Sequence, residues 1–154
     1  MGGFAHWLNT SRILVGREFA TQEEVLRALA ATFTSEEVHP AYAEGLLLRE
    51  QNYPTGLPTE PVGLALPHAD GRYVKVSGLA VSTLRRPVVF REMGNPEGEV
   101  WARVVILIAV SEERPNDQVA VLEWLMGLIQ EPGFLAELAA AGTPEEVMRR
   151  FGMT

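Results

Sequence analysis

The chain of 154 residues contains no cysteine. This absence excludes disulfide bonds, thiolate zinc sites and a cysteine nucleophile, and it fits a reducing compartment. Lysine is nearly absent too, because Lys75 is the only one, and the formal net charge is −7. Proteins that bind nucleic acid usually carry a basic stripe, which the scattered arginines do not form. We therefore expect no nucleic acid partner.

Long apolar runs are also missing. No segment approaches the roughly 20 apolar residues that a membrane-spanning helix requires, and the N-terminus lacks the features of a signal peptide. We expect a soluble cytoplasmic protein without direct membrane insertion. The length and the hydrophobic content of 47% predict a single domain over 1–154, with an irregular N-terminal arm at 1–11.

Capping signals and apolar periodicity predict helices in both outer thirds of the chain. Thr21 and Glu24 form a capping box, and apolar residues at helical spacing follow them. A second helix is expected over 40–50. In the C-terminal third, Asn116 is the expected N-cap of a long helix, and Thr143 begins another capping box.

The middle of the chain is rich in β-branched and apolar residues, which predicts a sheet. Strands are expected over 62–67, 77–84, 88–90 and 101–110, and a turn over 95–98. The connections between them are too short for helical crossovers, so the sheet should be mixed. The order of elements predicts an α/β fold, in which a single layered domain has a mixed β-sheet flanked by helices.

The segment Leu64-Ala65-Leu66-Pro67-His68 joins a predicted strand to a histidine. Proline cannot donate a ladder hydrogen bond and suits the end of a strand, so His68 should lie at a strand's edge on stiff backbone. Imidazole titrates near neutrality and can act as a nucleophile or carry a proton. The alternative is a histidine that merely ends a strand.

Arg49 stands at the end of the second predicted helix, and the loop over 54–61 could fold it back toward His68. This pair suits phosphoryl transfer, whose transition state spreads charge over the phosphoryl oxygens. Imidazole supplies a nucleophile, and the planar guanidinium matches phosphate oxygens. Taken alone, Arg49 could instead interact with the last carbonyls of its helix.

Three segments with specific spacing resemble the EIIA type 2 component of the sugar phosphotransferase system (PTS), of the fructose/mannitol superfamily. They are Leu47-Leu48-Arg49-Glu50, Tyr53-Pro54-Thr55-Gly56-Leu57-Pro58-Thr59 and Gly63-Leu64-Ala65-Leu66-Pro67-His68. Segments 84–94 and 125–130 look most like the galactitol-specific branch. The resemblance covers roughly 24–151, nearly the whole chain.

The resemblance implies a phosphotransferase component that needs no cofactor and no metal. His68 would accept a phosphoryl group from the phosphohistidine of HPr and pass it to a cysteine of a cognate EIIB. The sugar, galactitol or a related polyol, would be phosphorylated during import through EIIC. The family arginine that holds the phosphoryl group falls on Arg49. The fold implied is a mixed sheet between helices.

Further site residues are expected around His68. A second histidine of many family members falls on Gln118, which can donate a hydrogen bond but cannot carry a positive charge. Thr55 and Asp70 are candidate supporting residues, and Asp70 could either orient His68 or form a turn. An apolar rim that includes Leu57 and Leu66 is expected to meet partner proteins.

Two other functions stay open at this point. The domain could be a regulatory EIIA module of the nitrogen-related type, whose phosphorylation state controls partner proteins. It could also be a small metal-dependent hydrolase that uses His6, His39 and His68, although their spacing matches no metal motif.

Overall fold

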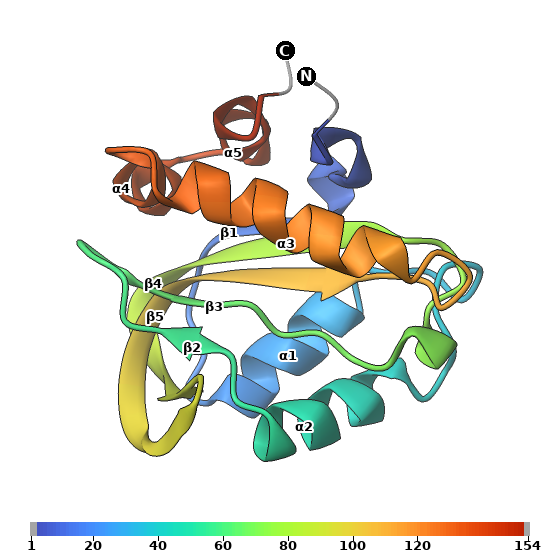
Figure 1. Ribbon diagram of the computed structural model, residues 1–154. Coiled ribbons are helices and arrows are strands. Elements are labelled where there is room, and N and C mark those ends of the chain that lie inside the picture. The colour runs from blue at the N-terminus through green and yellow to red at the C-terminus, as the bar shows by residue number, and fades with distance from the viewer. Residues whose placement is uncertain (1–2, 153–154) are drawn as a thin grey trace.

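The computed structural model describes residues 3–152 and has a mixed sheet between two helical layers (Figure 1). Helices α1 and α2 cover one face of the sheet, and α3, α4 and α5 lie on the other. The helices are α1 Gln22–Ala30, α2 Tyr42–Asn52, α3 Asn116–Ile129, α4 Phe134–Ala140 and α5 Pro144–Arg150. The strands are β1 Ile13–Arg17, β2 Gly56–Leu57, β3 Gly63–Ala65, β4 Gly78–Glu92 and β5 Asn95–Ala109. Short 3-10 turns lie at η1 Ala5–Trp7, η2 Thr10–Arg12 and η3 Gly71–Tyr73. The predicted layered α/β fold is confirmed.

The sheet has the strand order β1-β4-β2-β3-β5, with β4 and β5 also paired as an antiparallel hairpin. Strand β1 runs parallel to β4, and β3 runs parallel to β5, so the sheet is mixed as expected. Alternate residues of β5 enter two cores. Val105 and Leu107 pack with α1 and α2, whereas Ile106 and Ile108 pack with α3.

Two predicted caps are present and one is displaced. The hydroxyl of Thr21 accepts from the Glu24 amide, and that of Thr143 accepts from the Glu146 amide. The prediction that Asn116 caps α3 is wrong, because Asn116 is already its first helical residue. Pro115 before it has helical backbone angles, φ −62° and ψ −26°, so the chain turns one residue earlier.

The predicted strands at 77–84 and 88–90 are one strand, β4, whose pairing with β5 changes register between Thr83 and Val88. Pro87 lies in this gap, where it cannot donate to the ladder. The predicted turn at 95–98 belongs to β5 instead. Glu92 pairs with Asn95, and Gly94 adopts a φ of +77°, which suits a two-residue hairpin turn.

Within residues 3–152, no single helix is long and apolar enough to span a bilayer. Helices α3 and α4 pass that test only when taken together, and they meet at a bend of 87°.

Candidate functional site

Strand β3 leads directly to His68 along the side of β5. The carbonyl of Pro67 accepts from the Ile108 amide at 3.0 Å, and His68 forms a parallel bridge with Ile108. Pro67 therefore takes part in the pairing only through its carbonyl oxygen. Strand β5 fixes the backbone of both Pro67 and His68. The side chain of His68 is half-buried.

The ring of His68 is held by one hydrogen bond to the backbone. Its Nδ1 lies 3.2 Å from the carbonyl oxygen of Leu66. Since a carbonyl oxygen only accepts, this bond requires a proton on Nδ1. The neutral ring then carries its free lone pair on Nε2. The geometry leaves Nε2 as the ring nitrogen with an available lone pair.

Two effects lower the pKa of His68 and one opposes them. Burial disfavours the charged ring and is the largest cause. The bond to Leu66 raises the pKa, and the positive charge of Arg49 lowers it again. The pKa of His68 therefore lies below its ordinary value, which favours the neutral form of the ring.

We expect an NMR pH titration to find the pKa of His68 below the ordinary value for histidine. In an Arg49→Met variant the pKa should rise toward that value, because a positive charge near the ring has been removed. Phosphorylation chemistry is not needed for this measurement. A His68 pKa at or above the ordinary value, or one that does not rise in Arg49→Met, would contradict this electrostatic description.

Arg49, in the last turn of α2, lies close enough to influence His68, as the sequence predicted. Its guanidinium carbon is 4.5 Å from the centre of the Tyr53 ring. Its Nε is buried and has no hydrogen-bond partner among the described residues. Together with Asp70 and Arg72, Arg49 lines a groove of about 150 Å³ between α2 and η3. His68 does not line this groove, but the charge of Arg49 acts on its ring, and a planar donor group of this kind is suited to bind a phosphoryl group.

Thr55 is fixed by a buried carboxylate that the sequence did not single out. Glu50 accepts from the Thr55 amide through Oε2 and from the Thr55 hydroxyl through Oε1, both at 2.8 Å. Burial raises the pKa of Glu50, while the two bonds from Thr55 oppose that rise. The carbonyl of Thr55 in turn accepts from the Leu66 amide at 3.3 Å. Helix α2 is thereby connected to the segment that leads from β3 to His68.

Gly56, within the predicted loop over 54–61, lies in β2 instead. A Cβ at this position would lie 2.6 Å from the carbonyl oxygen of Arg91 in β4. The Met93 amide donates to the Gly56 carbonyl at 2.8 Å. Close approach of two backbones therefore explains the glycine of the proline-threonine-glycine loop.

Asp70 and Gln118 lie near this region without a hydrogen bond to His68 in the described part of the chain. The carboxylate of Asp70 accepts from the Arg72 amide at 3.0 Å and caps η3. Of the two readings of Asp70, the hydrogen bonds favour the turn, and the Leu66 carbonyl orients the ring instead. Gln118, in the first turn of α3, lines a separate pocket of about 230 Å³ with Gly71 and Val110.

The expected apolar rim consists of different residues. Leu66 is only 2% exposed and belongs to the core beneath α3, together with Leu64. Leu57 is partly buried against the same core. The exposed apolar side chains beside Arg49 are instead Leu48 and Tyr53, which are 60% and 61% exposed. The prediction is wrong for Leu66, which shares the buried core beneath α3 with Leu64.

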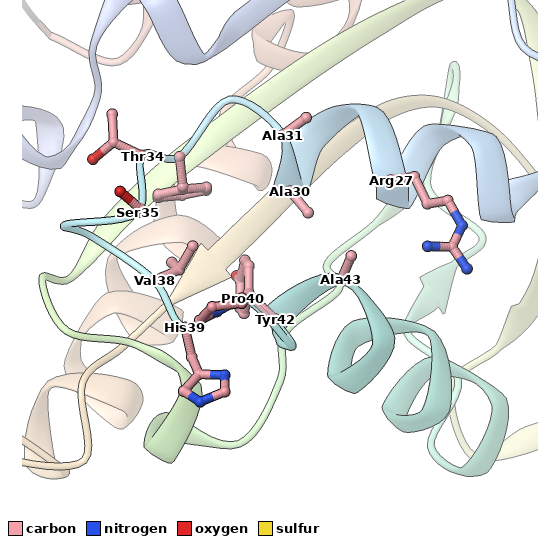
Figure 2. A pocket seen from close by; sticks show the side chains of 11 residues that line it. Arg27, Ala30, Ala31, Thr34, Ser35, Val38, His39, Pro40, Tyr42 and Ala43 are labelled. Carbon is pink, nitrogen blue, oxygen red and sulfur yellow. The ribbon is translucent and has the colours of Figure 1, made fainter.

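A second pocket, of about 370 Å³, lies between α1 and α2 (Figure 2). Figure 2 shows Arg27 and His39 at opposite ends of it, and the buried Tyr42 follows His39 by three residues in the chain. Tyr42 precedes Arg49 by seven helical residues, a rise of roughly 10 Å. None of the residues predicted to serve phosphoryl transfer lines this pocket.

The three histidines lie in separate segments: His6 in η1, His39 before α2 and His68 after β3. Among residues 3–152, no group of three or more histidine, aspartate or glutamate side chains could hold a metal ion. His39 accepts from the Ala41 amide through Nδ1 and so supports the entry to α2.

Comparisons with known proteins place the chain among PTS components. Residues 6–152 match the family described as "Phosphoenolpyruvate-dependent sugar phosphotransferase system, EIIA 2". The PTS system galactitol-specific EIIA component of Escherichia coli (strain K12) is 26% identical over 137 residues, which cover 88% of each chain. The transcriptional regulator ManR of Bacillus subtilis (strain 168) is 29% identical over 133 residues, which cover 84% of this chain and 19% of ManR.

The fold is similar to that of a chain in a solved complex. In a solution structure from Escherichia coli, enzyme IIA for mannitol is bound to phosphorylated enzyme IIB for mannitol. The similarity has a TM-score of 0.76 with 25% identity, and it covers 94% of this chain and 96% of that one.

Proposed function

We propose that this chain, which belongs to the EIIA 2 family of the phosphoenolpyruvate-dependent sugar phosphotransferase system, carries a phosphoryl group on Nε2 of His68. The donor is phospho-HPr and the acceptor is a cognate EIIB. The observation that carries the proposal is the hydrogen bond between Nδ1 of His68 and the Leu66 carbonyl, which leaves Nε2 unprotonated beside the charge of Arg49.

Each transfer exchanges one bond to phosphorus for another. The Nε2 lone pair attacks the phosphoryl group of phospho-HPr, a new N–P bond forms, and the donor nitrogen leaves with the electron pair of the old bond. In the second transfer, the cysteine sulfur of EIIB attacks, and His68 leaves as the neutral ring. Nδ1 keeps its proton on the Leu66 carbonyl throughout, so the ring needs no general base.

Arg49 supplies fixed positive charge to these transfers. A phosphoryl group passes through a loose transition state with charge on its equatorial oxygens, and a guanidinium presents donors in a plane that matches those oxygens. Tyr53 stacks against the guanidinium and limits its movement. Thr55 supports the site through its bonds to Glu50 and Leu66. Gln118 and Asp70 are proposed as secondary positions that act on the bound group or on partners.

The sugar proposed is galactitol or a related polyol. Support comes from the galactitol-specific EIIA component, which matches over most of both chains. The partner class is supported by the mannitol complex, in which a similar chain is bound to phosphorylated enzyme IIB. Leu48 and Tyr53, which line the groove and are exposed, offer apolar side chains that a partner could contact during a brief encounter.

A regulatory role is the second candidate, and the match to part of ManR favours it. In that case, the phosphorylation state of His68 would control a partner protein. The two roles differ in the fate of the phosphoryl group, because a carrier passes it to EIIB whereas a regulatory module retains it.

Incubation with phosphoenolpyruvate, enzyme I and HPr should add about one phosphoryl group per chain, since one histidine acts as acceptor. The product should be labile in acid and stable in alkali, as phosphohistidine is. Addition of a galactitol-type EIIB should then remove the label from this chain. Absence of label despite phosphorylated HPr would overturn the proposal, and label that no EIIB accepts would favour the regulatory role.

A further inference from the structure

Next to the antiparallel pairing of β2 with β3, one residue pair forms only one of its two expected backbone hydrogen bonds. Gly56 is opposite Ala65 and Leu57 is opposite Leu64, so the next pair is Thr55 with Leu66. The Leu66 amide donates to the Thr55 carbonyl, which identifies a hydrogen-bonded pair. In such a pair the two residues normally exchange both bonds.

The returning bond, from the Thr55 amide to the Leu66 carbonyl, is not formed. The Thr55 amide donates to Oε2 of Glu50 instead, at 2.8 Å. The Leu66 carbonyl therefore receives no hydrogen bond from the Thr55 amide. It accepts from Nδ1 of His68 instead. Because the carboxylate engages the Thr55 amide, the ring Nδ1 does not share the Leu66 carbonyl with that amide.

We infer that Glu50 is a positioning residue for His68: by capturing the Thr55 amide, it reserves the Leu66 carbonyl for Nδ1 and keeps the lone pair on Nε2. Glu50 acts through two backbone groups and does not touch the imidazole. This inference rests on the proposed function for its purpose, but the tautomer that it predicts exists without any phosphoryl group.

Because these groups are buried, water cannot easily take the place of a missing hydrogen-bond partner. Glu50 is 3% exposed and Thr55 is 2% exposed, so water does not replace a lost partner cheaply. If the carboxylate is removed, the Thr55 amide needs an acceptor, and the Leu66 carbonyl of its own ladder pair is the nearest in register. The Nδ1 proton then competes with the Thr55 amide for the Leu66 carbonyl, and its hydrogen bond weakens.

Two variants at position 50 separate this role from simple packing. Glu50→Gln keeps an oxygen that accepts from the Thr55 amide, and its NH₂ group can donate to the Thr55 hydroxyl. Glu50→Met fills a similar volume but offers no comparable acceptor. We expect the Nδ1-protonated tautomer in the wild type and in Glu50→Gln, and a population shift toward the Nε2-protonated form in Glu50→Met.

The readout is ¹⁵N NMR of the histidine ring in the unphosphorylated protein, at a pH where His68 is neutral. If the competent tautomer falls to about a tenth of the population, phosphoryl uptake should slow by about tenfold in Glu50→Met. An Nδ1-protonated ring that persists in folded Glu50→Met would overturn the inference, whether or not His68 accepts phosphorus. If the predicted tautomer shift is seen but neither the wild type nor any variant takes up a phosphoryl group, only the proposed function is overturned.

A measurement on the wild type alone keeps the inference testable if Glu50→Met does not fold. A hydrogen bond between backbone groups gives a scalar coupling between the amide nitrogen and the carbonyl carbon. We expect no such coupling from Thr55 nitrogen to Leu66 carbonyl carbon, and a neutral His68 protonated on Nδ1. Detection of that coupling, or of an Nε2-protonated His68, would refute the role of Glu50.

Discussion

The His68→Ala variant should take up no phosphoryl group from phospho-HPr while it keeps its fold. The variant loses the only atom that the proposed chemistry attaches phosphorus to, so the expected effect is complete loss and not a slower rate. The fold should survive because His68 is half-buried and its ring makes a single hydrogen bond, to Leu66. The measurement is label bound per chain after incubation with phosphoenolpyruvate, enzyme I and HPr.

His6→Ala is the matched control for this experiment. His6 is exposed and lies in η1, and its removal should leave uptake at the wild-type level. Retention of wild-type labelling in folded His68→Ala would move the acceptor to another residue and end the proposal. A far-UV circular dichroism spectrum and an NMR spectrum establish that the variant is folded before the label is counted.

The two residues proposed to react could be singled out from the sequence, because their signals are local. Proline before His68 indicates the end of a strand, and Arg49 stands in the last turn of a helix that its own periodicity predicts. The spacing between them matches a family pattern, and the structure places the charge of Arg49 near the ring. Local chemistry plus spacing therefore sufficed for these two residues.

The role inferred for Glu50 could not be predicted from the sequence in the same way, although Glu50 stands beside Arg49 in the motif. Its role depends on an interrupted ladder between β2 and β3, and both strands are too short to give a periodic signal. A buried carboxylate also looks like any exposed glutamate in sequence. The function of such a residue becomes visible only when the missing partner of the Thr55 amide is traced.

The errors in the fold have a related cause. Asn95-Pro96-Glu97-Gly98 has the composition of a turn, yet pairing across the hairpin places these residues in β5 and the turn at Gly94. Leu66 follows an apolar alternation that fits either a surface rim or a core, and only the packing of α3 decides for the core. Tertiary pairing overrides the local signal in both cases.

The second large effect is expected at Arg49. Replacement by methionine keeps an unbranched side chain of similar length but removes the charge and the donors, and it should slow phosphoryl uptake by about 10²–10³-fold, as the loss of a preorganised donor does in other enzymes. Arg49→Lys should recover part of the rate, because lysine restores the charge but not the planar fork. Initial rates of label uptake at limiting phospho-HPr would measure both variants.

Arg72→Met is the control that separates chemistry from general surface charge. Arg72 lines the same groove as Arg49, but it is exposed and donates to the Tyr73 hydroxyl at 3.0 Å. Its loss should change uptake by no more than about threefold, as expected of a charge that steers encounter but touches no reacting atom. Equal losses in the Arg49 and Arg72 variants would mean that both arginines act on HPr docking. A rate within threefold of wild type in Arg49→Met would remove the guanidinium from the mechanism, and His68 would then depend on backbone orientation alone.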